Sequence, residues 1–253
     1  MVSFFLLPND PSETSWLSKE ERELVVIRIH RDSLSSQARG PIWEGFKQAC
    51  TDPKTWLFCL IFNLNISTCS FVNFFPTIVK SLGFTSNVTA LLLTAPPYVL
   101  SALTSIPLAW SSGHFKERTW HITAGFSVAV VGFVVSCSNM SIGARYASTF
   151  LYTTGAYSVT PIILSWIPAT LGQTPEKKAV ALSLVNVLGN AAYIYGAYLW
   201  PEGDSPKYSI GFSSMVAFAV GGIACVWVMK SWLMHLNRKL KRQREDSRPV
   251  YSY

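Results

Sequence analysis

Residues 55–79 read TWLFCLIFNLNISTCSFVNFFPTIV, and this stretch decides the fold because it contains no Asp, Glu, Lys or Arg. A helix rises about 1.5 Å per residue, so about 20 residues cross a hydrocarbon core about 30 Å thick. A charge at the centre of a bilayer costs about 2.5–3.5 kcal/mol on insertion scales. An uncharged stretch of this length therefore predicts a membrane-spanning helix.

Five further uncharged stretches of at least 22 residues follow along the chain. Only 14% of all residues are charged, whereas an average soluble domain has about 25%. A soluble helical protein would need polar helix faces to cover these stretches, and the sequence offers none. We therefore expect an all-α integral membrane protein with six transmembrane helices. The predicted spans are 56–79, 88–110, 120–138, 145–168, 178–200 and 209–233.

Tryptophan positions agree with these boundaries. Amphipathic aromatic rings prefer the interface between membrane and water, so tryptophans near span ends are expected to act as interfacial anchors. Those near predicted ends are Trp56, Trp110, Trp120, Trp166, Trp200 and Trp232.

The basic residues predict the orientation. With six spans, 18 of the 21 Lys and Arg residues fall on one side of the membrane, and only Lys80, Arg145 and Lys207 fall on the other. Cytoplasmic loops carry an excess of Lys and Arg, so both termini are predicted to be cytoplasmic, with the plasma membrane as the expected location. The net charge of +7 then serves topology and contact with the lipid bilayer. Nucleic acid is not an expected partner.

The chain is predicted to divide into three parts. Residues 1–8 look like the end of a hydrophobic helix whose beginning is absent. Ser18 and Glu21 have the spacing of a capping box, which predicts an amphipathic helix to about residue 32, and a short helix is expected from Trp43 to Ala49. The predicted parts are a cytoplasmic loop at 1–53, a six-helix transmembrane domain at 54–234 and a basic cytoplasmic tail at 235–253.

No enzyme or metal site is expected. The carboxylates lie in loops and termini, the four histidines are scattered, and no Gly-rich phosphate loop is present. The five cysteines show neither a CxxC motif nor paired spacing. We predict a protein without catalytic activity, cofactor or metal.

Polar residues at membrane depth are the candidate substrate-binding residues. Asn186 and Asn190 are four residues apart, so they share one face of the fifth predicted span near its middle. An unpaired amide in hydrocarbon costs several kcal/mol. Such residues therefore either line a wet cavity or join helices through hydrogen bonds worth about 0.6–2 kcal/mol. Both alternatives stay open.

Asn65 and Tyr157 are predicted to bind substrate as well. Asn63 and Asn73 are weaker candidates. Asn63 and Asn65 lie about 200° apart on a helix, so at most one of them can face a cavity.

Arg145 stands at the outer end of the fourth predicted span. It could attract an anion, or it could be an interfacial arginine that snorkels to the headgroups. Prolines inside the spans are expected to break or kink their helices, and such breaks often mark moving parts. They are Pro96, Pro97, Pro107, Pro161 and Pro168.

Several motifs resemble the allantoate permease family, which belongs to the anion:cation symporter branch of the major facilitator superfamily and is abundant in fungi. The resemblance covers nearly the whole chain, in the order of the second half of that family. Its residues include Leu7-Pro8-Asn9-Asp10-Pro11, Thr14-Ser15-Trp16-Leu17-Ser18-Lys19-Glu20-Glu21, Arg28, Arg31-Asp32, Thr51-Asp52-Pro53-Lys54-Thr55-Trp56, Phe74-Phe75-Pro76-Thr77-Ile78, Leu82-Gly83-Phe84, Thr94-Ala95-Pro96-Pro97-Tyr98, Arg145-Tyr146, Gly155-Ala156-Tyr157, Trp166, Asn186, Gly189-Asn190 and Pro201.

The resemblance implies a major-facilitator-type half bundle. Members look like twelve-helix proteins, and this chain begins at the end of the sixth helix, so an N-terminal six-helix half would be missing. The implied function is symport of a small organic anion, such as a ureide, vitamin or carboxylate, with a coupling cation that we expect to be a proton. No carboxylate lies inside the predicted spans, so a coupling residue is expected in the missing half. The alternative is a truncated, non-transporting six-helix protein or an association subunit.

One departure from the family concerns gating. An Asp-Arg pair usually follows the eighth family helix, whereas this chain has Ser111-Ser112-Gly113-His114 there. Lys116, Glu117 and Arg118 keep part of the charge. Because the Asp of this pair is missing, the resemblance does not imply that this chain has the inward gate of the family.

Overall fold

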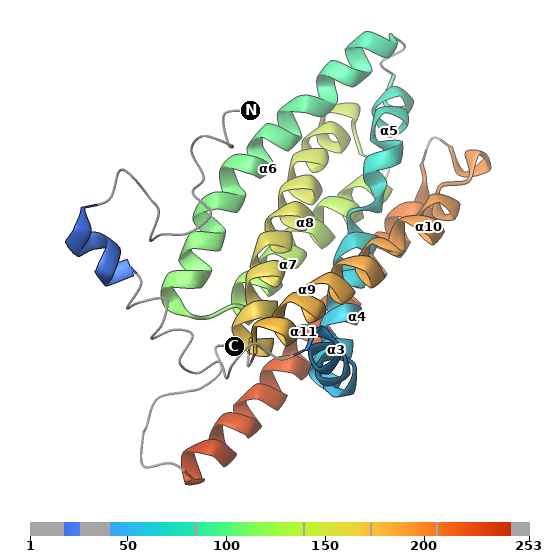
Figure 1. Ribbon diagram of the computed structural model, residues 1–253. Coiled ribbons are helices and arrows are strands. Elements are labelled where there is room, and N and C mark those ends of the chain that lie inside the picture. Colours follow the sequence, from blue (N-terminus) through green and yellow to red (C-terminus); the bar gives the residue numbers. More distant parts are fainter. Residues whose placement is uncertain are drawn as a thin grey trace.

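The computed structural model describes residues 18–25, 41–83, 86–138, 140–172, 174–205 and 207–243. All regular elements within these ranges are helices (Figure 1), which confirms the all-α prediction. In chain order they are α3 (Ile42–Thr51), α4 (Pro53–Thr68), η2 (Ser70–Phe74), α5 (Phe75–Ser81), α6 (Asn87–Phe115), α7 (Thr119–Cys137), α8 (Ile142–Leu171), α9 (Pro175–Asn190), α10 (Ala192–Gly196), η3 (Ala197–Leu199), η4 (Glu202–Asp204) and α11 (Ser209–Gln243).

Five helical stretches among the described residues are long and apolar enough to cross a membrane. They match five of the six predicted spans. The remaining predicted span, 145–168, corresponds to α8, which has 30 residues but is less apolar than the other five. Its polar side chains are tolerated because α8 packs against four other helices, so that neighbouring protein covers much of its surface. The five apolar stretches are Pro53–Ser81, Asn87–Phe115, Thr119–Cys137, Pro175–Leu199 and Ser209–Leu240.

α7 and α8 approach each other backbone to backbone. A Cβ atom added to Gly155 would lie 2.5 Å from the backbone nitrogen of Ala129 and 2.6 Å from the carbonyl oxygen of Gly125. A Cβ atom on Gly132 would lie 2.6 Å from the backbone nitrogen of Tyr152. Small residues of this kind let membrane helices approach backbone to backbone.

The prolines do not break their helices, so this part of the prediction was wrong, and kinks at these positions stay a prediction. α6 continues through Pro96, Pro97 and Pro107, and α8 continues through its two prolines. Proline leaves the carbonyl four residues earlier without its helical donor. The Tyr146 hydroxyl donates to one such carbonyl, that of Leu93, at 3.0 Å, so a neighbouring helix replaces the bond that Pro97 removes.

Helix breaks occur instead where no proline predicts them. α4 ends at Thr68 and gives way to a 3-10 turn, and α9 ends at Asn190 before α10 begins. At the end of α4, the hydroxyls of Ser67 and Thr68 donate to the carbonyls four residues earlier, at 2.7 and 2.8 Å. Hydroxyls bonded in this way often bend helices.

The tryptophans divide into two groups. Trp56, Trp110 and Trp120 are 50%, 68% and 57% exposed, as interfacial anchors would be. Trp166 and Trp200 are buried, so the prediction that they act as anchors was wrong. Trp166 meets Phe58 edge to face at 5.3 Å within the core. The core has room for these rings, because small neighbours such as Gly211 lie against Trp200.

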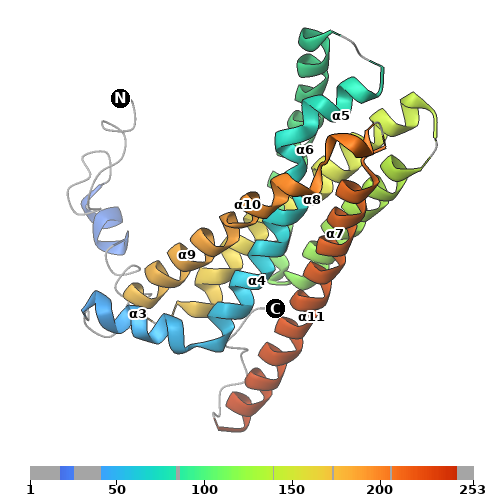
Figure 2. The same cartoon turned by 90° about the vertical axis from the view of Figure 1, so that its right-hand side faces the viewer.

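The N-terminal segment behaves as predicted where the structure describes it. The Glu21 backbone N–H donates to the Ser18 hydroxyl at 3.2 Å, and the Ser18 N–H donates to the Glu21 carboxylate at 3.0 Å, which confirms the capping box. The predicted helix after Trp43 is α3, and Figure 2 shows α3 running across the lower ends of α9 and α4. The expected helix end at 1–8 lies outside the described residues.

Charged side chains clamp one end of the bundle. The Lys177 ammonium lies 2.7 Å from Asp52, whose carboxylate also caps α4 by accepting from the backbone N–H of Lys54 at 3.0 Å. The Lys230 ammonium lies 2.7 Å from Glu117. These ion pairs tie α9 to the start of α4, and α11 to the loop before α7.

Candidate functional site

Two tyrosines from two helices meet on the aromatic core at the break that ends α4. Tyr98 comes from α6 and Tyr157 from α8, and we call them the tyrosine cluster. Their rings are 5.6 Å apart, edge to face, and both pack against the core cluster that contains Cys69 at the break. Tyr193 of α10 packs against the other core cluster. The tyrosine cluster therefore joins two helices that are far apart in the sequence.

Each member of the tyrosine cluster is partly buried. Tyr157 packs edge to face on Phe71 of η2 at 6.1 Å, and Tyr98 packs on Phe75 of α5 at 5.5 Å. Phe71 and Phe75 are fully buried. One side of the cluster thus rests on the core, and part of its surface stays accessible.

Asn65 lies on the side of α4 that faces α8. Its side chain is fully buried, and its amide donates to the Thr160 hydroxyl at 2.9 Å. Thr160 is three residues from Tyr157, on the same face of α8. The side-chain oxygen of Asn65 is buried without a hydrogen-bond partner. Asn65 therefore joins two helices and keeps an unused acceptor beside the cluster; substrate contact remains a prediction for it.

Asn63 faces a different helix, as its angular separation from Asn65 predicted. Its amide donates to the Leu188 carbonyl of α9 at 3.0 Å, and its side-chain oxygen accepts from the Tyr195 hydroxyl at 2.7 Å. The Tyr195 and Ser67 hydroxyls are 2.5 Å apart. These polar groups join α4 to α9 and α10 beside both helix breaks.

Asn186 and Asn190 use their amides within α9. Asn186 donates to the Leu182 carbonyl at 3.3 Å, and Asn190 donates to the Asn186 carbonyl at 2.8 Å. Asn186 is partly buried and Asn190 is exposed. Among the described residues, neither amide joins α9 to another helix. Their assignment as substrate-binding residues stays a prediction.

The remaining candidates lie apart from the cluster. Asn73 is exposed on η2, and Arg145 is partly buried in the first turn of α8. The sequence analysis missed Tyr98 and Thr160. The available signal was that Tyr98 directly follows the Pro96-Pro97 pair in an uncharged stretch.

The tyrosine cluster contains no charged residue. In the described part of the spans, charged side chains stand in the first or last turns or in the ion pairs at the end of the bundle. Among these same residues, no three His, Cys, Asp or Glu side chains gather as a metal site would require. The Tyr98 hydroxyl is buried, so the cluster mainly offers aromatic ring faces, which suit an uncharged or ring-shaped part of a ligand.

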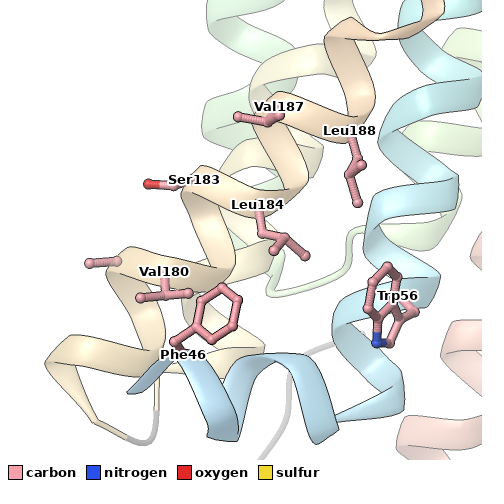
Figure 3. Close-up of a pocket in the computed structure, with 8 residues that line it drawn as sticks. Phe46, Trp56, Val180, Ser183, Leu184, Val187 and Leu188 are labelled. Carbon is pink, nitrogen blue, oxygen red and sulfur yellow. The ribbon is translucent and has the colours of Figure 1, made fainter. Parts of the chain in front are cut away.

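A separate apolar groove of about 530 Å³ lies between α3, α4 and α9. Figure 3 shows Leu184 and Leu188 of α9 facing Trp56 of α4, with Phe46 of α3 at the lower end. Ser183 is the polar residue of its lining; the others are Ala179, Val180 and Val187. This lining offers little to a polar solute.

Comparison with known proteins identifies relatives among transporters. The sequence model of the Major Facilitator Superfamily matches residues 1–197. An uncharacterized transporter of Schizosaccharomyces pombe is 28% identical over 241 residues, covering 94% of this chain and 48% of the relative. The major facilitator-type transporter hxnP of Emericella nidulans is 28% identical over 252 residues, covering 96% of this chain and 50% of the relative.

A third relative carries a substrate in its name. The high-affinity nicotinic acid transporter of Saccharomyces cerevisiae is 28% identical over 213 residues, covering 83% of this chain and 40% of the relative. The chain thus spans about half the length of the curated relatives it matches or less. No solved structure matches it.

Proposed function

The chain belongs to the Major Facilitator Superfamily, and on that premise we propose that it forms the C-terminal six-helix half of a transporter for a small organic anion. Membership of a transporter family also places the chain outside the enzymes, as predicted. The multi-pass membrane assignment agrees with its apolar helices. The plasma membrane, with both termini in the cytoplasm, is the proposed location.

The tyrosine cluster is the observation that carries this proposal. It brings side chains of α6 and α8 together on the core at the break after α4, and it contains no charged residue. Substrate sites of transporters lie near the bilayer midplane, where discontinuous helices meet. Asn65, hydrogen-bonded to Thr160 one turn from Tyr157, adds a polar group beside the cluster, and we propose that Asn186 and Asn190 also contact substrate. This arrangement supports one wall of a substrate cavity.

Two considerations support the substrate class. The sequence resembles symporters of organic anions, and one relative is named for nicotinic acid, a small aromatic carboxylate. Coupling to a cation, with a proton as the proposed ion, would require a titrating group within the membrane. The described spans place no carboxylate near the cluster, so we assign coupling to a preceding six-helix half.

The experiment uses yeast cells that lack their own nicotinic acid transporter. The chain is expressed alone or together with the N-terminal half of that transporter, and uptake of radiolabelled nicotinate, allantoate and short carboxylates is measured per molecule of membrane protein. We expect uptake of at least one anion from the pair and no concentrative uptake from the chain alone. Absence of uptake from both, with normal membrane abundance, would favour a non-transporting subunit instead.

A further inference from the structure

The tyrosine cluster points to one chemical feature of the ligand. We propose that Tyr98 and Tyr157 hold a planar aromatic ring, so that this half of the protein selects aromatic over aliphatic carboxylates of the same size. The inference rests on the proposed function, because it assigns a substrate class to the same site. It adds that recognition by this chain is directed at the ring and not at the charge.

The ring geometry supports this assignment. The Tyr98 and Tyr157 planes meet at 73°, and the Tyr157 and Phe71 planes meet at 85°. Aromatic pairs prefer such edge-to-face contacts with centroids about 4.5–7 Å apart. Tyr98 and Tyr157 keep accessible surface, so an aromatic ligand ring can make a further edge-to-face contact with them. An aliphatic ring would gain only apolar contact.

Buried aromatic side chains of the core support the tyrosine cluster. Phe71 contacts the Tyr152 ring at 4.7 Å, and Tyr152 stacks on Phe133 at 4.9 Å. All three of these side chains are fully buried. A ligand ring would meet tyrosines whose orientation is already fixed, which lowers the entropy that binding has to overcome.

An unused hydrogen-bond acceptor lies beside the cluster. The side-chain oxygen of Asn65 is buried and has no partner, although its amide is bonded to Thr160. A buried acceptor without a donor is destabilising. A donor on the ligand ring, or a water molecule that enters with the ligand, would satisfy it.

The absence of charge in the cluster makes the proposal specific. The described parts of α4, α6, α8 and α10 bring no Lys or Arg to the cluster, so this chain does not neutralise a carboxylate there. An aromatic acid and its uncharged amide should therefore bind this chain about equally. An aliphatic ring acid of similar size should bind more weakly.

The test measures binding to the purified full chain in lipid nanodiscs. The probes are nicotinate, nicotinamide and cyclohexanecarboxylate, and the readout is the ligand-dependent shift of the thermal unfolding temperature. We expect similar dissociation constants for the first two and a constant about three- to tenfold higher for the third. Equal affinity for all three probes, or no binding by any of them, would overturn the proposal.

Variants separate ring recognition from core packing. Tyr157→Phe should keep the preference for aromatic probes, and Tyr157→Leu should abolish it. Tyr198→Leu is the matched control, because Tyr198 is 82% exposed on η3. If Tyr157→Leu fails to fold, Tyr98→Leu replaces it. A preference that survives the leucine variant contradicts the proposal.

The result also separates this inference from the proposed function. Uptake of aliphatic and aromatic acids with equal efficiency would leave transport standing and overturn the ring assignment. A ring preference in nanodiscs without any uptake in cells would leave the binding site standing and overturn transport.

Discussion

The Tyr195 hydroxyl donates a hydrogen bond of 2.7 Å to the side-chain oxygen of Asn63, and so joins α10 to α4 beside the breaks of two helices. The same hydroxyl lies 2.5 Å from the Ser67 hydroxyl. Asn63 in turn holds the Leu188 carbonyl next to the end of α9. The two discontinuous segments are thus fastened to each other by side chains as well as by apolar packing.

Removing the Tyr195 hydroxyl should loosen this joint. Tyr195→Phe keeps the ring but leaves Asn63 without its donor, so we expect a loss of about 1–2 kcal/mol in the free energy of unfolding. Thermal unfolding in nanodiscs measures it. Tyr198→Phe is the control, because Tyr198 is exposed and belongs to the same segment. Equal unfolding temperatures for both variants would mean that the hydroxyl does not stabilise the joint.

The Asp52 carboxylate predicts a dependence of stability on pH. Burial raises its pKa, but the Lys177 ammonium, the Lys54 N–H and the charges of both lysines together lower the pKa below the ordinary value of 3.8. A group with a lowered pKa stabilises the fold above its unfolded pKa, and this contribution disappears as the pH falls through the folded pKa. We expect Asp52→Asn to be less stable than the unmodified chain at pH 7.

The comparison for Asp52 is made by measuring unfolding temperatures from pH 7 downward. The difference between the chain and Asp52→Asn should shrink as the pH falls below 3.8. Glu44→Gln serves as a control, because Glu44 is exposed on α3. A difference that is constant with pH would show that Asp52 acts through something other than its charge.

Gly155 should not tolerate a larger side chain. The Cβ atom of Gly155→Ala would meet backbone atoms of α7 at 2.5 and 2.6 Å, and backbone cannot move aside as a flexible side chain can. We expect α7 and α8 to separate, with a loss of about 1–3 kcal/mol in the free energy of unfolding. Gly143→Ala, where no atom lies within 4 Å of the added carbon, should leave the unfolding temperature unchanged or slightly higher.

The sequence predicted the helices well because hydrocarbon imposes a simple rule on them. Long uncharged stretches must be helical in a membrane, and the spans around α4, α6 and α11 followed directly. α8 was predicted from its lack of charge, although its packing in the bundle lets it be more polar than the other spans.

The candidate site was harder to predict because helix breaks change which residues share a face. A helical wheel assumes one continuous helix, and no proline or glycine indicates the break at Cys69, where two hydroxyls bond back to the preceding turn. Tyr98 was missed although α6 is continuous, because only its contacts with Phe75 and Tyr157 show that it belongs to the candidate site. Trp166 shows the opposite error, since its position near a span end indicated an anchor although packing places it in the core.

The predicted orientation can be tested with reporter fusions. Because basic residues concentrate on one side, fusions after Arg244 and within residues 111–119 should lie in the cytoplasm, and one within 201–207 should lie outside. The 111–119 loop contains Glu117, whose ion pair with Lys230 joins this loop to α11. A reporter on the wrong side at any of the three sites would refute the six-span topology.

The Asn190→Ala variant tests whether the proposed amide residues contact the substrate. It is exposed, and its amide donates within α9, so Asn190→Ala should break no bond between helices and should leave insertion and unfolding temperature nearly intact. Uptake should fall if the side chain contacts substrate.

The assay uses the chain together with the N-terminal half, and uptake is normalised to membrane protein. Ser183→Ala, another exposed polar residue of α9, is the control. Normal uptake per molecule in Asn190→Ala would remove Asn190 from the site, and a lowered unfolding temperature would assign it to helix stability instead.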